Sequence, residues 1–272
     1  MSKSTISFIS FFISLISLFL SVFNINGVFY DSPDSIDYAS AKHVFVYSNS
    51  VIKNMGKDSY GVMQGACTDG TYAYYTVLSK TNDKCSIIKY KIDTWKEVAR
   101  KDNVPVDHGN DITYNKDLDC LIVCNSAPNK DVISFVDKDT LTVTKTVKLP
   151  IEIHSITYNE ATKQYVVGIS LGFKFAFLDK NFKITKVVNG VNPTSTARQG
   201  MDSDSKYIYF IYSYPNVISV YDWNGVHQGF VSLDDIAQEY ESENIFHIND
   251  TFYIGYNYQQ GSVYKTSLKA IY

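Results

Sequence analysis

This chain has no large excess of positive or negative charge. Its 272 residues include 25 Lys and Arg against 28 Asp and Glu, so the formal net charge at pH 7 is only −3. A protein that binds the phosphates of a nucleic acid needs a broad basic surface, which so small a net charge does not supply. We therefore expect no nucleic-acid partner.

Motifs that hold metals or phosphates are also missing. The sequence contains no C-x-x-C pair, no H-E-x-x-H segment and no glycine-rich loop of the phosphate-binding type. Structural zinc sites usually depend on closely spaced cysteine or histidine ligands. The sequence therefore predicts no metal site and no cofactor.

Tryptophan and helical periodicity are scarce as well. There are 2 Trp against 22 Tyr and 16 Phe, and no segment has the pattern of a long helix. Tyrosine suits half-exposed strands, because its ring packs while its hydroxyl reaches water or a neighbouring group. With 45% hydrophobic residues the chain can still bury a large core. These features favour an all-β globular protein.

Strand-forming segments recur in five copies. Each copy has a short apolar or small-residue run, a turn rich in Asp, Asn or Gly, and an aromatic and β-branched run. The copies are Gly65–Thr76, His108–Cys124, His154–Ile169, Arg198–Tyr212 and Glu243–Tyr256. A period of about 45 residues is typical of propeller blades. The sequence thus predicts an all-β, five-bladed β-propeller of four-stranded antiparallel blades.

The last copy lacks one strand. Three strand-like segments lie between Ile245 and the end of the chain at Tyr272, whereas His43–Asn49 has no repeat of its own. An unpaired blade edge invites aggregation, so we expect His43–Asn49 to complete the last blade and close the ring. A single β-propeller domain is predicted over residues 43–272, after a leader over residues 28–42.

Two stretches carry a resemblance to known propellers. The segment DVISFVDKDTLTVTKTVKLP, residues 131–150, resembles a blade of the YVTN/NHL-type β-propellers, and NVISVYDWNG, residues 216–225, is similar to it. This resemblance covers residues 43–268 and implies a fold, without an activity. MQGACTDG and RQGMDSD, which begin at Met63 and Arg198, are similar to the Gln-Gly strand of secreted glutaminyl cyclotransferases, which are five-bladed propellers.

The N-terminal segment has the features of an export signal. After Lys3, the segment Ile6–Phe23 is apolar apart from serines, which predicts a secretory signal peptide over residues 1–27 with cleavage near Gly27. The alternative is an uncleaved signal anchor, since about 18 apolar residues can just span a bilayer. Both alternatives place the domain outside the cytosol. After cleavage we expect no stable membrane span.

The four cysteines suit an oxidising compartment. Cys67 and Cys85 belong to one repeat and form a candidate disulfide, with buried free thiols as the alternative. Cys120 and Cys124 share one face of a strand at a separation of roughly 13 Å, too far to bridge each other. Asn249 begins an Asn-Asp-Thr glycosylation sequon at a predicted turn.

Polar side chains precede or begin the inner strand of every repeat, where ordinary strands carry small or apolar residues. They are Gln64; His108, Asn110 and Asp111; His154; Arg198 and Gln199; and Glu241 and Glu243. Equivalent positions of a closed ring lie near one axial level, so we expect these groups to converge in a central cup. The cup would hold a polar ligand such as a glycan, a peptide end or a small acid. Alternatively, these groups solvate the channel mouth and bond to neighbouring blades.

A secreted, non-catalytic binding module is the function that this pattern favours. The first alternative is an extracellular enzyme, such as a lyase or cyclotransferase with His108 and Glu241 or Glu243 as acid and base. Arg198 would then neutralise a substrate carboxylate, and we expect it to pair with Glu243 when no ligand is bound. The second alternative is a scaffold for another extracellular protein on the Tyr-rich surface.

Two further enzyme classes use the same residues. A glycosidase would draw its carboxylate pair from Asp111, Glu152 and Glu243. A metal-dependent enzyme would use His108, His154 and a carboxylate. The sequence alone does not choose between these classes.

Overall fold

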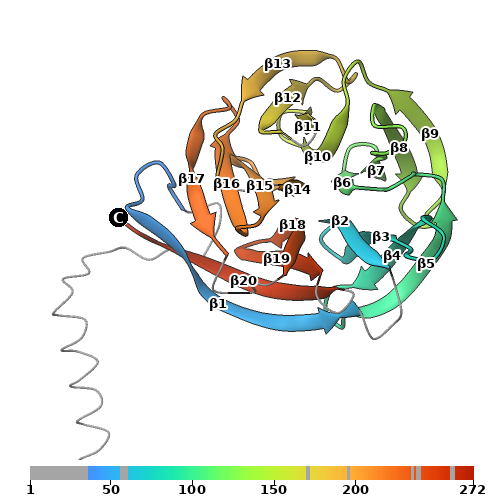
Figure 1. Cartoon of the computed structure of the whole chain (residues 1–272), viewed down its shortest axis with the longest axis horizontal. Helices are drawn as coiled ribbons and strands as arrows, with labels where there is room; N and C mark the ends of the chain where they lie inside the picture. The colour runs from blue at the N-terminus through green and yellow to red at the C-terminus, as the bar shows by residue number, and fades with distance from the viewer. Residues whose placement is uncertain are drawn as a thin grey trace, which may run out of the picture.

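Five four-stranded antiparallel sheets, arranged as a ring, make up the protein (Figure 1). The structure is a computed structural model, and it describes residues 36–55, 61–169, 172–194, 197–233, 236, 240–257 and 261–272. The five-bladed β-propeller predicted from the repeats is confirmed.

Blades 1 to 4 each follow the chain from the axis outward. Blade 1 consists of β2 (Val62–Thr68), β3 (Tyr72–Leu78), β4 (Cys85–Lys91) and β5 (Lys96–Val104). Blade 2 consists of β6 (Asp111–Asn115), β7 (Cys120–Cys124), β8 (Val132–Asp137) and β9 (Val143–Lys148). Blade 3 consists of β10 (Ile153–Asn159), β11 (Gln164–Ile169), β12 (Lys174–Leu178) and β13 (Ile184–Asn189). Blade 4 consists of β14 (Ala197–Ser203), β15 (Tyr207–Ser213), β16 (Val217–Asp222) and β17 (His227–Ser232).

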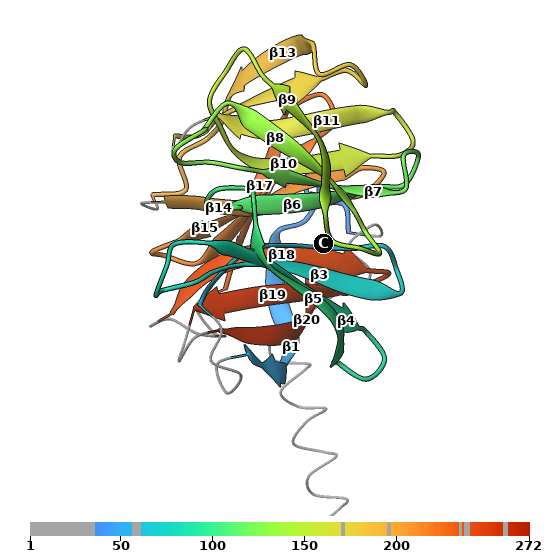
Figure 2. The same ribbon diagram turned by 90° about the vertical axis from the view of Figure 1, so that its right-hand side faces the viewer.

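Blade 5 is built from both ends of the chain. Its inner strands are β18 (Glu241–Ile248), β19 (Thr251–Asn257) and β20 (Ser262–Ile271), and its outermost strand is β1 (His43–Asn54). The strand β1 pairs antiparallel with β20, from His43 opposite Ile271 to Asn54 opposite Ser262. In Figure 2, where the ring is turned by 90°, the two strands again lie side by side. The predicted closure is therefore confirmed, and β1 continues past Asn49.

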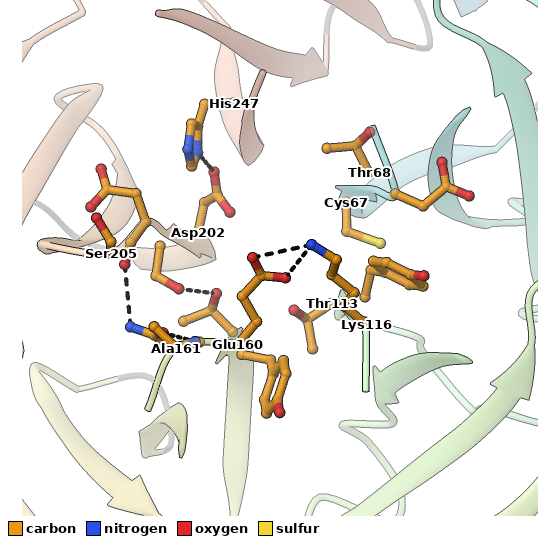
Figure 3. A pocket seen from close by; sticks show the side chains of 16 residues that line it. Cys67, Thr68, Thr113, Lys116, Glu160, Ala161, Asp202, Ser205 and His247 are labelled. Atoms are coloured by element: carbon orange, nitrogen blue, oxygen red, sulfur yellow. Dashed lines mark hydrogen bonds and ion pairs between the residues drawn. The ribbon is translucent and has the colours of Figure 1, made fainter. Parts of the chain in front are cut away.

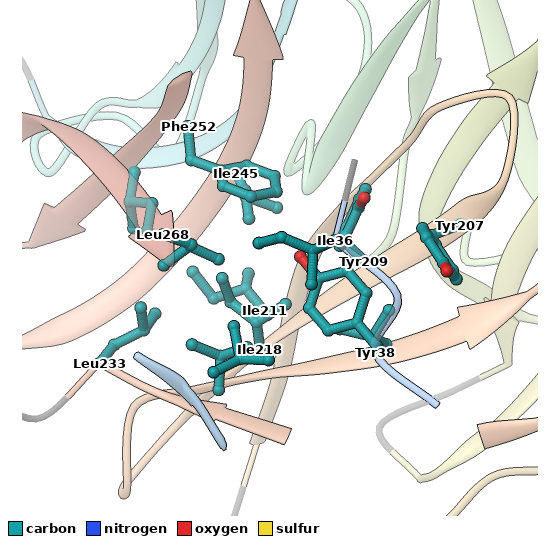
Figure 4. Close-up of a cluster of buried hydrophobic side chains, with 14 of the residues drawn as sticks. Ile36, Tyr38, Tyr207, Tyr209, Ile211, Ile218, Leu233, Ile245, Phe252 and Leu268 are labelled. Atoms are coloured by element: carbon teal, nitrogen blue, oxygen red, sulfur yellow. The ribbon is translucent and has the colours of Figure 1, made fainter. Parts of the chain in front are cut away.

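The described end of the leader belongs to the core. Ile36 and Tyr38 are 1% and 4% exposed, and the ring of Tyr38 meets that of Tyr207 edge-on at 5.0 Å (Figure 4). The sequence pattern did not indicate this packing, because residues 28–42 have no periodicity. The expected signal peptide lies outside the described residues. Within the described part of the chain, no helix is long and apolar enough to cross a membrane.

The hydrophobic core consists of five clusters, one at each junction between neighbouring blades. Aromatic rings bridge these junctions, as where Phe175 of blade 3 contacts Phe210 and Tyr221 of blade 4. The middle strands are buried on both faces, whereas outer strands such as β9 expose lysines. Exposed lysines on an edge strand discourage pairing with other chains.

Aspartates fix the outer hairpins, as their spacing predicts. A carboxylate oxygen of Asp137 accepts hydrogen bonds from the backbone N–H groups of Asp139 and Thr140. Asp179 and Asp222 hold the matching turns of blades 3 and 4 in the same way. Asp side chains stabilise such turns because they substitute for a backbone acceptor.

Candidate functional site

Four of the five inner strands carry one extra residue at the same level of the ring. In β2 the stretch from Met63 to Ala66 is one residue longer than the stretch of β3 that pairs with it. The strand β14 has the same irregularity between Arg198 and Met201. The pairings of β10 and β18 shift at His154 and Glu243. A β-bulge re-aims the side chains beside it. Here the bulged residues Gln64, His154, Gln199 and Glu243 all line one cavity at the axis.

This cavity, which we call the cup, lies where the inner strands begin and measures about 340 Å³. It brings together eight of the nine residues predicted to converge, and the ninth, Asp111, does not line it. The eight are Gln64, His108, Asn110, His154, Arg198, Gln199, Glu241 and Glu243. Val62, Leu78 and Ala197 complete the wall.

A pair of carboxyl groups forms one side of the cup. Glu243 is 5% exposed, and burial together with the neighbouring Glu241 carboxylate raises the pKa of Glu243 well above its usual range. A hydrogen bond to Glu241 raises this pKa further, while a hydrogen bond from the Asn257 amide opposes the shift. Gln199 donates to the Glu241 carboxylate at 2.8 Å. Glu243 therefore holds its proton at a pH where an exposed carboxyl group has lost it.

The two histidines of the cup have lowered pKa values. Burial, the Arg198 charge and His108 lower the pKa of His154 to about 4. A hydrogen bond to the Arg198 backbone acts in the opposite direction and raises this pKa. Burial also lowers the pKa of His108, while the Asp83 carboxylate opposes the shift. Both rings are neutral at pH 7, so each offers one donor and one acceptor.

Side chains in the cup and beside it also connect blades. The Asn110 amide donates to the backbone carbonyl of His154, and the Asn244 amide donates to that of Gln64. This agrees in part with the alternative that such groups only join blades. However, no described residue bonds to the side-chain amide of Gln64 or to the His108 ring, so both remain available to a ligand.

Arg198 does not pair with Glu243, and that expectation is wrong. Its guanidinium is fully buried, donates from Nη1 to the Lys174 carbonyl at 2.6 Å, and lies 5.1 Å from the centre of the Phe210 ring. A Cβ at Gly168 would lie 2.5 Å from Nη1, so only glycine leaves room for the arginine there. The side chain points between blades 3 and 4, because Arg198 precedes the bulge.

Asp111 closes the axis below the cup. It is fully buried, and its two carboxylate oxygens accept the backbone N–H groups of Ile112 at 3.0 Å and Ile156 at 2.9 Å. Burial raises the pKa of Asp111, and these hydrogen bonds with one from the Met201 N–H oppose the shift. The carboxyl group thus joins blades 2, 3 and 4.

The glycosidase and metal alternatives do not fit this geometry. Of the three carboxylates considered for a glycosidase, Asp111 is enclosed and Glu152 lies outside the cup, 4.0 Å from the Lys130 ammonium. Among the described residues, no three His, Cys, Asp or Glu side chains are grouped to hold a metal ion. The histidine and carboxylate set proposed for a metal is therefore not assembled.

Cys67 and Cys85 are both free thiols in this structure. Cys67 pairs with Tyr74, and Tyr74 pairs with Lys89, which is four residues from Cys85 along β4. Four residues of strand span about 13 Å, far beyond the Cα separation that a disulfide allows. The predicted bridge does not form, because its two cysteines lie at opposite ends of the blade.

Two residues near the site carried no clear sequence signal. Asn257 bonds Glu243 and accepts the Met63 N–H at 3.1 Å, so it joins blade 5 to blade 1 beside the cup. Tyr214 is 50% exposed, and partial burial with the charges of Glu241 and Glu243 raises its pKa. Asn257 ends the second strand of blade 5 and Tyr214 follows that of blade 4, where the repeat offers no guide. Asn249 of the sequon is exposed in the turn between β18 and β19, as expected.

Comparison with known proteins identifies the architecture. No model of a known protein family matches the chain. No curated protein matches its sequence. The glutaminyl cyclase of Myxococcus xanthus matches with a TM-score of 0.61 at 10% identity, over 85% of this chain and 100% of that one. This chain and the cyclase share a propeller fold.

Weaker matches have similar identities. Hydrazine synthase of Kuenenia stuttgartiensis has a TM-score of 0.47 at 14% identity, over 76% of this chain and 58% of that one. A streptogramin B lyase has a TM-score of 0.44 at 15% identity, over 78% and 66% of the two chains. At 10% identity the likeness to the glutaminyl cyclase concerns the fold, and the activity has to be argued from the cup itself.

Proposed function

We infer that the cup binds a small polar molecule that both donates and accepts hydrogen bonds. The observation that carries this inference is the convergence of the Glu241–Glu243 pair and the unbonded Gln64 amide on one cavity. About 340 Å³ lies at the small end of the roughly 300–1,000 Å³ range of ligand pockets. A sugar unit, a peptide end or a small hydroxy acid fits this volume and chemistry.

The test compares two isosteric variants. Glucose, N-acetylglucosamine, lactate and the dipeptide Gln-Ala serve as probes in thermal-shift and calorimetric titrations. Glu243→Gln keeps the shape and removes the titratable proton, and Glu152→Gln makes the same change on the exposed surface. We expect binding of at least one probe that weakens in Glu243→Gln alone. Equal affinities in the two variants would contradict a role for the cup.

Acid–base catalysis is the second candidate. A buried carboxyl group with a raised pKa, such as that of Glu243, is suited to act as a general acid. The glutaminyl cyclase of similar fold makes Gln-Ala the first substrate to assay, by mass spectrometry. Turnover that is lost in Glu243→Gln while binding persists would support an enzyme. Binding without turnover of any probe would support the non-catalytic module.

We also propose that the domain is exported. The apolar segment Ile6–Phe23 behind Lys3 supports a signal peptide. N-terminal sequencing of protein recovered from the medium of an expressing eukaryotic cell should begin near residue 28. Glycosidase treatment should lower the mass if Asn249 carries a glycan. Recovery of the whole chain in the membrane fraction would instead favour the signal anchor.

A further inference from the structure

A second cavity opens at the opposite end of the axis, where the inner strands finish (Figure 3). Its volume is about 480 Å³, larger than that of the cup, and all five blades contribute to its wall. Blade 1 contributes Cys67 and Thr68, blade 2 Thr113 and Lys116, blade 3 Thr157 and Glu160, blade 4 Asp202 and Ser203, and blade 5 His247. We call it the strand-end cavity.

The strand-end cavity is separate from the cup. Asp111 fills the axis between them, and Gly65 and Gly200 let neighbouring strands approach it. A Cβ at Gly65 would lie 2.4 Å from the Asp111 Cα, and one at Gly200 would lie 3.2 Å from its Oδ1. The two ends of the axis therefore have different linings and no residue in common.

The carboxylates of the strand-end cavity already have partners. Asp202 contacts His247 Nδ1 at 2.5 Å, and Glu160 contacts the Lys116 ammonium at 2.9 Å. Asp204 accepts two backbone N–H groups of its own turn. Asp69 does the same in blade 1. Each of these carboxylates is therefore held in place by a hydrogen-bond or ion-pair partner within the protein.

Hydroxyl groups supply the bonding capacity that remains. Thr157 and Ser203 share a hydrogen bond of 2.8 Å in which either oxygen can donate, so the pair can turn to suit a ligand. The Thr113 hydroxyl has no partner among the described residues, and its residue lines the cavity. These uncharged hydroxyl groups can both donate hydrogen bonds to a ligand and accept hydrogen bonds from it.

Two tyrosines line the cavity with their hydroxyls fixed. Tyr114 donates to the Asp119 carboxylate at 2.6 Å, and Tyr158 donates to that of Asp117. These bonds hold both rings in place in the wall of the cavity. Apolar ring surface beside hydroxyl and amide groups suits a molecule with C–H and O–H faces.

We propose that the strand-end cavity binds a neutral polyhydroxylated ligand, a monosaccharide or the terminal unit of an oligosaccharide. The hydroxyls of Thr113, Thr157 and Ser203 bond the ligand hydroxyls, and Tyr114 and Tyr158 pack against its C–H face. This site is independent of the ligand proposed for the cup.

The test titrates the full chain with glucose, galactose, mannose, fucose and N-acetylglucosamine, with affinity measured by calorimetry or saturation-transfer NMR. Thr113→Val is isosteric and removes the unused hydroxyl, and Thr146→Val makes the same change on the exposed face of β9. Glu243→Gln reports on the cup. We expect one sugar to bind, with affinity lowered roughly three- to tenfold in Thr113→Val, as for one hydrogen bond, and unchanged in the other two variants. Asp202→Asn serves as a second cavity variant if Thr113→Val melts early.

Three results would overturn the proposal. The first is the absence of binding by all five sugars. The second is a sugar affinity that falls in Glu243→Gln and not in Thr113→Val or Asp202→Asn, which assigns the sugar to the cup. The third is binding of arginine or spermidine in place of the sugars, which makes the strand-end cavity a cation site.

Discussion

Glutamine followed by glycine has two roles at the axis of this ring. Gln64 and Gln199 sit in bulges and turn their amides into the cup, while Gly65 and Gly200 leave room for Asp111. The dipeptide that resembled the cyclotransferase strand thus has a physical explanation, independent of activity. A bulge makes the glutamine point inward, and the missing Cβ lets the inner strands meet.

Convergence of the cup residues could be predicted, because the repeats place them at one level. The direction of Arg198 could not, since a bulge changes which residue faces the axis and leaves no mark in a single sequence. Arg198 pairs regularly with Tyr212, and the bulge begins at the next residue. A difference of one position decided between a ligand-facing charge and a buried one.

Glu243 should make stability depend on pH. Its pKa is raised on folding, so the folded chain binds the proton more tightly, and stability falls as pH rises above the ordinary value of 4.5. One such proton changes the free energy of unfolding by at most about 1.4 kcal/mol per pH unit. Glu243→Gln should flatten this decline in urea titrations at pH values above 4.5. His154, whose pKa is lowered, acts in the opposite direction below pH 6.5. Parallel curves for the variant and the wild type would exclude a retained proton on Glu243.

Among the elements, β1 has the largest influence on the ring. It covers the outer edge of β20 over its whole length, and Ile36 and Tyr38 before it fill the junction of blades 4 and 5. Counting strands in the last repeat was sufficient to predict this closure. The packing of residues 36–42 was not predictable, because two isolated apolar side chains form no periodic pattern.

Removal of β1 should abolish cooperative unfolding. A chain that begins at residue 55 leaves β20 with an unpaired edge and empties part of a core cluster. We expect a broad thermal transition and binding of a hydrophobic dye, measured beside a chain that begins at residue 36. Equal melting of the two chains would show that the ring closes without strand exchange.

The turn of Asp204 offers a smaller test. Its carboxylate accepts the Lys206 and Tyr207 N–H groups, both at 2.7 Å, and the Tyr209 hydroxyl. Asp204→Ala should lower the free energy of unfolding by roughly 1–3 kcal/mol, the cost of leaving such donors unpaired. Asp250→Ala, in the matching exposed turn of blade 5, should change it little. Similar losses in both variants would mean that the turn hydrogen bonds do not matter.

For the whole molecule, the organising feature is continuity around the ring. Each blade shares a hydrophobic cluster with both neighbours, so no blade has a core of its own. The repeat period predicted the five blades of this ring. It did not predict that the axis would be closed in the middle, since that depends on Asp111 meeting two glycines from other blades. The second cavity was missed for the same reason.

Thiol reactivity should report global unfolding. Cys67, Cys85 and Cys124 are buried, burial raises the pKa of Cys85 to about 12, and all four cysteines are free. Labelling of native protein with a thiol reagent should modify at most the half-buried Cys120, and denaturant should release the other three together. A reductant should leave the melting temperature unchanged. A fall in melting temperature on reduction would instead indicate a disulfide.

Ring closure by both termini also sets an order of events during synthesis. Asp37 bonds the Tyr272 hydroxyl, and these residues are 235 positions apart in the sequence. At about 5–20 residues per second, the ribosome makes the second partner roughly ten seconds to a minute after the first. The earliest strand of the ring is thus the last to find its neighbour. Its backbone groups stay without their partner strand until β20 has been made, and a ribosome that stalls before β20 leaves a nascent chain that cannot close.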